Sequence, residues 1–376
     1  MKKGKRIMQF RCNTKKLAEA LSVTGRAVST KSSMPAMEGI LIRTDNNQIT
    51  LHAYNLELGI STAIDAECQT DGEIVLNAKI FTDMVRKLPG ETVEVKSNEK
   101  LLTIVTSGAA EFTILGIPAL EFPELPVFSD GTSIELPENL LMSMIRQTIF
   151  SISTDESNPI HTGILFELQD KVLRLVAVDG FRLAIRKEQV KEEQNTSFVV
   201  PGKTLTEIYK LLHPENDDPI TINIGKKHLL FETGGYTIIS RLLEGQFLDY
   251  KSVLSGTKTA EARVNARTLT NSIDRASLLI TDRLKSPVRC IFEPDRIRIK
   301  CSSSIGKIYD EVNAIFDGEP CEMGFNNRYL IDALKATDCD EIRIQLGGSL
   351  SPMKICPPDG DAFIFLVLPV RLNADG

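Results

Sequence analysis

A long internal repeat is the feature that most constrains how this chain can fold. Three segments share an apolar start, a short polar bend and a helical stretch, and they lie 124 residues apart, at 74–88, 198–212 and 322–336. The same interval separates Gly39 from Gly163, whereas Leu269 follows Leu141 after 128 residues, so the third unit carries a small insertion. Repetition at a fixed spacing over this length indicates three copies of one structural unit.

Each unit is expected to be an α+β domain with two helices. Apolar residues at i, i+4 and i+7 predict a helix within each repeated segment, and a second helix opens each unit at 15–28, 139–150 and 267–280. Between the helices the pattern has period two, which is typical of a strand, a tight turn and a returning strand. We therefore predict domains at 1–128, 129–254 and 255–376, each with its helices on one face of roughly eight antiparallel strands.

The composition favours a globular protein without a membrane segment. Of the 376 residues, 42% are apolar and 25% are charged, which is ordinary for soluble domains. The longest wholly apolar run, 362–370, is far shorter than the ~20 residues that cross a bilayer. No apolar stretch of a secretory signal follows the basic start, in which Met8 is an alternative first residue. We expect a cytoplasmic protein.

No motif predicts a metal, a cofactor or a catalytic centre. The seven cysteines and four histidines show no metal-ligand spacing. Gly202-Lys203-Thr204 is similar to the end of a phosphate-binding loop, but position 197 is serine where that loop needs glycine. Paired loop acids such as Asp217 and Asp218 lack a repeated third acid for a two-metal site. A nucleotide-dependent enzyme is kept only as an alternative.

Charge is distributed unevenly over the elements. The net charge of -6 argues against a simple basic nucleic-acid binder. Each of the six expected helices is nevertheless positive, so the remaining residues are strongly acidic. Either these helices have ordinary solvated faces, or they present one surface to a polyanion and hold nucleic acid through its phosphates. A scaffold that binds only proteins is the third alternative, and in it neutralising the helices has no effect on DNA binding.

Two apolar segments predict a groove for a peptide. Residues 178–183 place a turn and an aromatic, Phe181, where the first unit has residues 54–57. A C-terminal apolar run is usually a strand of the core, but this one contains Pro369, which places its last residues at a sheet edge or in an extended tail. An extended apolar tail beside Phe181 would form a peptide-binding groove.

Five segments carry a resemblance to a known family. They are NLELGI (55–60), AVDGFRLA (177–184), EGQFLDY (244–250), FNNRYLIDAL (325–334) and LPVRL (368–372). Together with the threefold repeat, they make the chain resemble the bacterial sliding clamps, the β subunits of DNA polymerase III, from about Met8 to Leu372. The resemblance implies a non-catalytic processivity factor, a head-to-tail homodimer whose domains close a ring around duplex DNA with helices lining the hole.

The resemblance also implies partners. DNA would be held topologically and without sequence preference, and an ATP-driven clamp loader would open the ring. The catalytic subunit of the replicative polymerase, other polymerases and repair proteins would insert short motifs with leucine and phenylalanine anchors. The implied pocket consists of Val178, Gly180, Phe181, Arg182, Leu183, Leu248, Val253, Leu366, Val367, Leu368, Pro369, Val370, Arg371 and Leu372.

Several pocket positions depart from the family pattern. Leu248 stands where a proline is common, Leu368 and Val370 stand where methionine is frequent, and His161 replaces an apolar residue. Stiffer aliphatic side chains replace adaptable thioethers, which leaves the ranking of partners open. The tail 373–376 extends past the usual end, so a tail that partly covers the pocket is an alternative.

The resemblance further implies an interface and a DNA-facing set. Phe112 and Ile114 of one copy would face Leu278 and Leu279 of the other, with Lys79 opposite Asp310 or Glu311. The expected phosphate contacts are Arg26, Lys31, Lys79, Arg86, Arg146, Lys203, Lys210, Arg267 and Arg275. Their shared placement on or beside the helices is a stronger prediction than any single contact.

Overall fold

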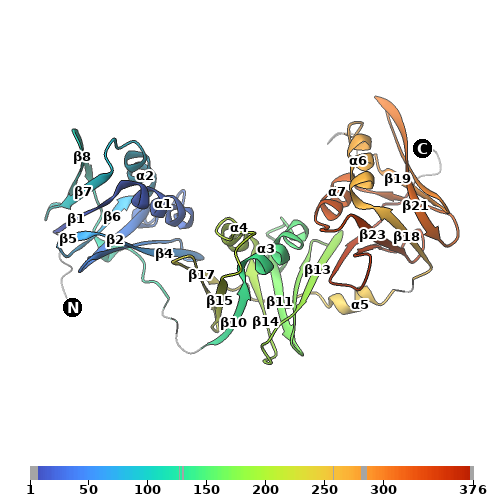
Figure 1. The fold of residues 1–376 in the computed structure, drawn as a ribbon, viewed down its shortest axis with the longest axis horizontal. Coiled ribbons are helices and arrows are strands. Elements are labelled where there is room, and N and C mark those ends of the chain that lie inside the picture. The colour runs from blue at the N-terminus through green and yellow to red at the C-terminus, as the bar shows by residue number, and fades with distance from the viewer. Residues whose placement is uncertain (1–6, 127, 129–130, 257, 281–285, 373–376) are drawn as a thin grey trace. The chain divides into compact units, whose positions relative to one another are not determined.

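The computed structural model describes residues 7–126, 128, 131–256, 258–280 and 286–372. Two expectations, for the basic start before Ile7 and for the tail 373–376, lie outside these residues. The helices and strands of the described part recur three times in one order (Figure 1). This order is strand, helix, a run of strands, helix and three further strands, and the sequence predicted all of it except the strand that opens each unit.

The elements have the following bounds. The first repeat contains β1 (Met8–Asn13), α1 (Thr14–Thr24), β2 (Gly39–Asp45), β3 (Gln48–Tyr54), β4 (Leu58–Asp65), β5 (Glu67–Thr70), β6 (Glu73–Asn77), α2 (Ala78–Arg86), β7 (Thr92–Ser97), β8 (Leu102–Ser107) and β9 (Ala110–Leu115). The second contains β10 (Thr132–Pro137), α3 (Glu138–Arg146), β11 (Gly163–Gln169), β12 (Val172–Val178), β13 (Arg182–Gln189), β14 (Thr196–Pro201), α4 (Gly202–Tyr209), β15 (Pro219–Ile224), β16 (His228–Thr233) and β17 (Tyr236–Arg241).

A short helix, α5 (Tyr250–Leu254), precedes the third repeat and was not expected. The third repeat contains β18 (Ala260–Asn265), α6 (Ala266–Ser277), β19 (Val288–Glu293), β20 (Arg296–Ser303), β21 (Gly306–Asp317), β22 (Cys321–Phe325), α7 (Asn327–Lys335), β23 (Glu341–Leu346), β24 (Met353–Cys356) and β25 (Phe363–Val367). The opening helices α1 and α3 end about one turn earlier than expected. The 3-10 turns η1 (Gly25–Ala27) and η4 (Ile149–Ser151) follow them.

Asparagine starts four of the helices. The side chains of Asn13, Asn77, Asn265 and Asn326 each accept a hydrogen bond from a backbone N–H two or three residues ahead. An asparagine at this place satisfies an N–H that the helix itself leaves unpaired. In the sequence, this signal is the asparagine directly before each of these four helices. The asparagine marks the point at which the preceding strand ends and the helix begins.

Contacts divide the chain into two compact units. The first is Met1–Glu138 with Lys210–Leu242, and the second is Asn139–Tyr209 with Leu243–Gly376. The first holds a five-stranded sheet, β5-β1-β7-β8-β9, and an eight-stranded sheet, β10-β15-β16-β17-β4-β3-β2-β6. The second holds a twelve-stranded sheet, β14-β11-β12-β13-β25-β24-β23-β18-β21-β20-β19-β22. Because the division passes through the middle repeat, the domain boundaries at 128 and 254 stay a prediction.

Two strand pairings join neighbouring repeats, and the sequence did not predict them. In the first unit β17 pairs antiparallel with β4, with Ile238 opposite Ile60. In the second unit β13 pairs antiparallel with β25, with Leu183 opposite Leu366. The second pairing places the end of the 178–183 segment beside the C-terminal run, so two segments far apart in sequence form one site.

Each unit buries the apolar faces of its helices. In the first unit α1 packs against α2, β3 and β4, and Leu17 and Phe81 are fully buried. In the second unit α6 packs against α7, β18, β20 and β21, and Ile273 and Leu330 are buried. None of the helices in the described part of the chain is long and apolar enough to span a membrane.

Candidate functional sites

The motifs considered for catalysis form no site. β14 runs directly into α4, so Gly202 and Lys203 begin a helix without the preceding loop that would cradle a phosphate. Among the described residues no group of three or more His, Cys, Asp or Glu side chains could hold a metal ion. All seven cysteines are free, and burial raises the pKa of Cys12 and of Cys290 to about 12, which keeps these two thiols protonated.

A tight turn presents Phe181 at the start of β13. The Asp179 carboxylate accepts hydrogen bonds from the backbone N–H groups of Phe181 and Arg182, each at 2.9 Å. Gly180 has φ +88°, a left-handed conformation that a residue with a side chain adopts only with strain. The turn therefore needs both the aspartate and the glycine, and it leaves the Phe181 side chain 58% exposed.

Arg182 ties this turn to helix α7. Its guanidinium contacts Asp179 at 2.9 Å and Asp332 on α7 at 2.5 Å. It also lies 4.6 Å from the centre of the Tyr329 ring and 5.6 Å from that of Phe150. Only 12% of the Arg182 side chain is exposed, so its guanidinium is mostly buried and its contacts link the turn to α7.

Tyr329 is a member of this site that the sequence analysis missed. It stacks on Phe181, with 5.8 Å between ring centres and 21° between ring planes. The repeat aligned Tyr329 with Phe81 and Leu205, which are fully buried, whereas Tyr329 is half-buried. A tyrosine at a position that is otherwise wholly apolar was the available signal, because its hydroxyl favours a place at the surface.

Beside the turn, exposed apolar side chains lie next to a buried apolar cluster, which we call the floor. Val178, Leu183 and Leu366 are almost fully buried in one cluster that also contains Tyr250. The exposed apolar side chains around it, which together with this floor we call the groove, are Phe181, Leu248, Val253, Leu368 and Val370, between 37% and 58% exposed. The Leu368 N–H donates to the Phe181 carbonyl at 2.9 Å, which joins the tail to the turn.

The structure places Val367 in the core and locates the remaining tail residues. Val367 is fully buried in the core of the third repeat, on the face of β25 opposite Leu366, because side chains alternate along a strand. Its place in the pocket stays a prediction. Beyond β25, Pro369 is half-buried and Arg371 is exposed, and the N–H of Val370 donates to the Gly324 carbonyl at 2.8 Å.

Gly324 permits the tail to lie close to β22. A Cβ at this position would come within 2.4 Å of the Leu372 side chain, so a larger residue would displace the tail. Leu372 is therefore an anchor of the tail and only half-exposed. At the other side of the floor, the His161 ring meets the Phe247 ring edge-on at 5.5 Å, so the polar replacement at this family position packs as an aromatic.

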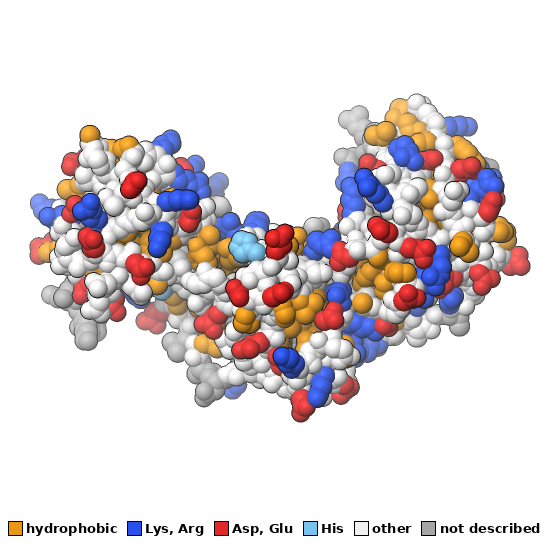
Figure 2. Space-filling view, in the orientation of Figure 1, with side chains coloured by type: hydrophobic (Ala, Val, Ile, Leu, Met, Phe, Trp, Pro, Cys, Tyr) orange, Lys and Arg blue, Asp and Glu red, His pale blue; other side chains and the backbone are white. Residues whose placement is uncertain are grey.

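The basic residues expected to face DNA lie on or next to the helices. Arg26 is in η1, Lys79 and Arg86 are on α2, Arg146 ends α3, Lys203 is in the first turn of α4 and Lys210 follows its end, Arg267 and Arg275 are on α6, and Lys31 is in the loop before β2. All are exposed except Arg26 and Arg146, which are half-buried. Basic and acidic side chains are interspersed on the face of the molecule drawn in Figure 2.

Several of these basic residues already have acidic partners. Arg146 forms an ion pair with Asp338, which also accepts from Gln147 at 2.9 Å. The Arg275 Nε donates to Asp310 at 2.9 Å, and Lys203 is 3.9 Å from Glu156. By contrast, Lys31, Lys79 and Arg267 have no carboxylate within ion-pair distance among the described residues, so their charges are the most available to a phosphate.

The expected interface residues lie on an open sheet edge and directly after a helix. β9 is the last strand of its sheet, and it exposes Phe112 (39%) and Leu115 (69%), with Ile114 half-buried. β21 pairs with β20 over residues 306–313 but with β18 only over 314–317, so its first part has an open edge among the described strands. Leu278, which directly follows α6, is 78% exposed, and Leu279 is half-buried.

The acids expected opposite Lys79 have partners within their own chain. Asp310 accepts hydrogen bonds from Arg275 and from Ser272, and these lower its pKa below the usual range although partial burial raises it. Glu311 pairs with Arg296 at 3.1 Å. An ion pair between copies through Lys79 would therefore join an existing network rather than complete a vacant one.

The chain matches three family models that together cover nearly its whole length. They describe the N-terminal, central and C-terminal domains of the DNA polymerase III beta subunit, and they match residues 8–126, 135–249 and 251–371. The chain is also 33% identical to the beta sliding clamp of Bacillus subtilis, over 97% of this chain and 100% of that one. The chain belongs to the DNA polymerase III beta subunit family.

Other members of this family agree in sequence and fold. The beta sliding clamp of Staphylococcus epidermidis is 32% identical over 97% of this chain and 100% of its own length. The crystal structure of the Bacillus subtilis DNA polymerase sliding clamp superposes with a TM-score of 0.95 at 33% identity, and it matches 97% of this chain and 100% of that one. The DNA polymerase III beta subunit of Thermotoga maritima has a TM-score of 0.89 at 29% identity, with the same shares covered. The threefold processivity fold that the repeat and the resemblance implied is thereby confirmed.

Proposed function

We propose that this chain is the sliding clamp of a bacterial replicative DNA polymerase. Two copies associate head to tail, close a ring around duplex DNA and keep the polymerase on its template. The observation that carries the proposal is the full-length match to proteins named beta sliding clamps, in sequence and in fold. Such a protein works in the cytoplasm at the nucleoid, and its three domains are taken as 1–128, 129–254 and 255–376.

Open sheet edges support closure of the ring between copies. β9 of one copy would add to the open edge of β21 in the other copy, and the two open strand edges would then satisfy each other. Phe112 and Ile114 on β9 would cover Leu278 and Leu279, whose apolar surface is exposed to solvent in a single copy. A head-to-tail contact of this kind closes only if its rotation suits a ring.

The basic helices support weak contact with the DNA backbone. Lys31, Lys79 and Arg267 are exposed, and so are Arg86 at the end of α2 and Lys210 directly after α4. The acidic partners of Arg146 and Arg275 dilute the positive charge. A ring holds DNA by its closed shape, and its phosphate contacts must stay weak enough for sliding.

The groove supports binding of short motifs with leucine and phenylalanine anchors. Exposed Phe181, Leu368 and Val370 surround a buried apolar floor, which is the arrangement that favours apolar anchors. The partners would be the polymerase catalytic subunit, the clamp loader and other polymerases and repair proteins. We assign no reaction to the chain, and ATP would be consumed by the loader.

Primer extension tests this proposal. The polymerase and clamp loader of the source organism extend a primed single-stranded circle with and without this protein, at a salt concentration that suppresses distributive synthesis. Products should lengthen at least tenfold when the protein is added, and Phe181→Ala should remove this effect. Product lengths that do not change on addition of the wild-type protein would contradict the proposal.

A further inference from the structure

One wall of the groove stands on a very short helix. Leu248 lies two residues before α5 and Val253 lies within it, and both are about 40% exposed. A helix of five residues is not stable in water, because it forms too few backbone hydrogen bonds to offset the ordering of its residues. The position of this wall must therefore depend on contacts between α5 and the rest of the second unit.

A buried tyrosine anchors the first turn of α5. Tyr250 is only 5% exposed and packs in the groove floor with Leu183 and Leu366. Its hydroxyl donates to the Glu167 carboxylate on β11 at 2.5 Å. Burial raises the pKa of Tyr250, and the neighbouring carboxylate raises it further, so the hydroxyl keeps its proton and stays a donor.

Glu167 collects further contacts from the same helix. Lys251 donates to its other carboxylate oxygen at 3.0 Å, and Arg174 on β12 lies 3.7 Å away. Partial burial raises the pKa of Glu167, but the hydrogen bonds from Tyr250 and Lys251 outweigh this and lower it below the usual value. The carboxylate is therefore charged at neutral pH and binds both of the first two residues of α5.

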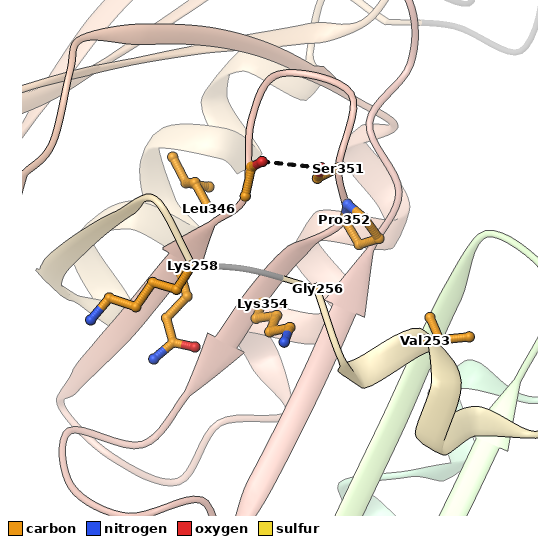
Figure 3. Close-up of a pocket in the computed structure, with 9 residues that line it drawn as sticks. Val253, Gly256, Lys258, Leu346, Ser351, Pro352 and Lys354 are labelled. Atoms are coloured by element: carbon orange, nitrogen blue, oxygen red, sulfur yellow. Dashed lines mark hydrogen bonds between the residues drawn. The ribbon is translucent and has the colours of Figure 1, made fainter.

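The last turn of α5 has its own anchor. Lys354 on β24 donates to the carbonyl of Leu254 at 2.6 Å. Figure 3 shows the hollow beside this connection, of about 140 Å³, with Val253 on α5 and Lys354 on β24 among its lining residues. The segment that carries Leu248 and Val253 is thus held by hydrogen bonds to β11 near its start and to β24 at its end.

We propose that Glu167 and Tyr250 form a positioning pair, which holds α5, and with it the Leu248 and Val253 wall, in the shape that a partner peptide binds. The inference rests on the proposed function of the groove. Neither residue needs to touch the peptide. A wall ordered in advance spares the peptide the cost of ordering it on binding.

Peptide affinity of the full-length protein tests the pair. A fluorescein-labelled peptide with leucine and phenylalanine anchors is titrated with wild type and variants, and anisotropy gives Kd. Glu167→Ala should raise Kd on the order of tenfold, and Tyr250→Phe, which keeps the ring, about threefold to tenfold. Glu167→Gln should recover part of the loss, because its amide oxygen still accepts from the Tyr250 hydroxyl. The double variant Glu167→Ala with Tyr250→Phe should have the same Kd as Glu167→Ala alone, since both changes remove the same hydrogen bond.

The matched control is Glu193→Ala. Glu193 also pairs with a lysine, Lys171 at 2.7 Å, but is 78% exposed and belongs to a different ion pair, so Kd should stay within twofold. Amide exchange of residues 248–254 should speed up in Glu167→Ala and not in the control. If the wild type binds the peptide and both Glu167→Ala and Tyr250→Phe bind it with the same Kd, the positioning role is overturned while the groove stands. A wild-type protein that does not bind the peptide would overturn the groove itself and this inference with it.

Discussion

Replacing Phe181 by alanine should weaken the binding of a partner peptide by about tenfold to a hundredfold. The magnitude follows from the exposed surface. A phenylalanine side chain has about 200 Å² to bury, and 58% of Phe181 is exposed, which leaves about 120 Å² for a partner to cover. At about 25 cal/mol per Å², complete coverage contributes about 3 kcal/mol and half coverage about 1.5 kcal/mol.

The substitution should leave the turn intact. The hydrogen bond from the residue 181 N–H to Asp179 uses the backbone, and Gly180 and the Arg182–Asp332 ion pair are unchanged. The assay is anisotropy of a labelled peptide with leucine and phenylalanine anchors, with the mass of the protein checked in parallel. Leu120→Ala is the control, because Leu120 is 79% exposed but belongs to the first unit, whereas every residue of the groove belongs to the second. A change in Kd of less than twofold for Phe181→Ala would refute the reasoning.

Three further predictions concern the interface, the DNA contacts and acid stability. Leu278→Asp should convert the dimer into a 41.6 kDa monomer, because it places a charge in the apolar contact; a dimer by sedimentation would contradict this. Lys31→Glu combined with Arg267→Glu should shorten the residence of loaded protein on circular DNA without changing the mass of the dimer, and unchanged residence would exclude these contacts. Burial, with a smaller effect of Arg43, lowers the pKa of His52 from 6.5 to about 4. Between these two pH values the folded chain binds fewer protons than the unfolded chain, so the free energy of unfolding falls as the pH drops from 6.5 towards 4. At pH 5 the loss should be about 2 kcal/mol relative to pH 7 in urea unfolding, and an equal loss in His52→Gln would show that other groups cause it.

Local patterns in the sequence were sufficient for the repeat and for most elements. Apolar spacing predicted the helices, and the alternation of apolar and polar residues predicted the hairpins such as β2–β3 and β11–β12. Pro369 predicted that the sheet stops before the chain does, and β25 indeed ends at Val367. These features depend on residues close in sequence, whose periodicity can be read directly.

The contacts that make the groove could not be read in this way. β13 meets β25 across about 180 residues of sequence, and Arg182 meets Asp332 across 150. Neither Tyr329 nor Glu167 belongs to a motif of its own, and their roles arise only where distant elements meet. The burial of Val367 also followed from the register of β25 against β13, since a shift by one residue would exchange its two faces.

Release of the loaded protein from cut DNA tests the central claim most directly. The protein is loaded onto a nicked circular duplex with the clamp loader and ATP, the circle is cut once, and the protein that remains bound is counted. A ring held by topology should slide off the ends, so that bound protein falls to background after cutting and stays on the uncut circle. Equal retention on the cut and uncut DNA would mean ordinary binding to the duplex and would contradict the account.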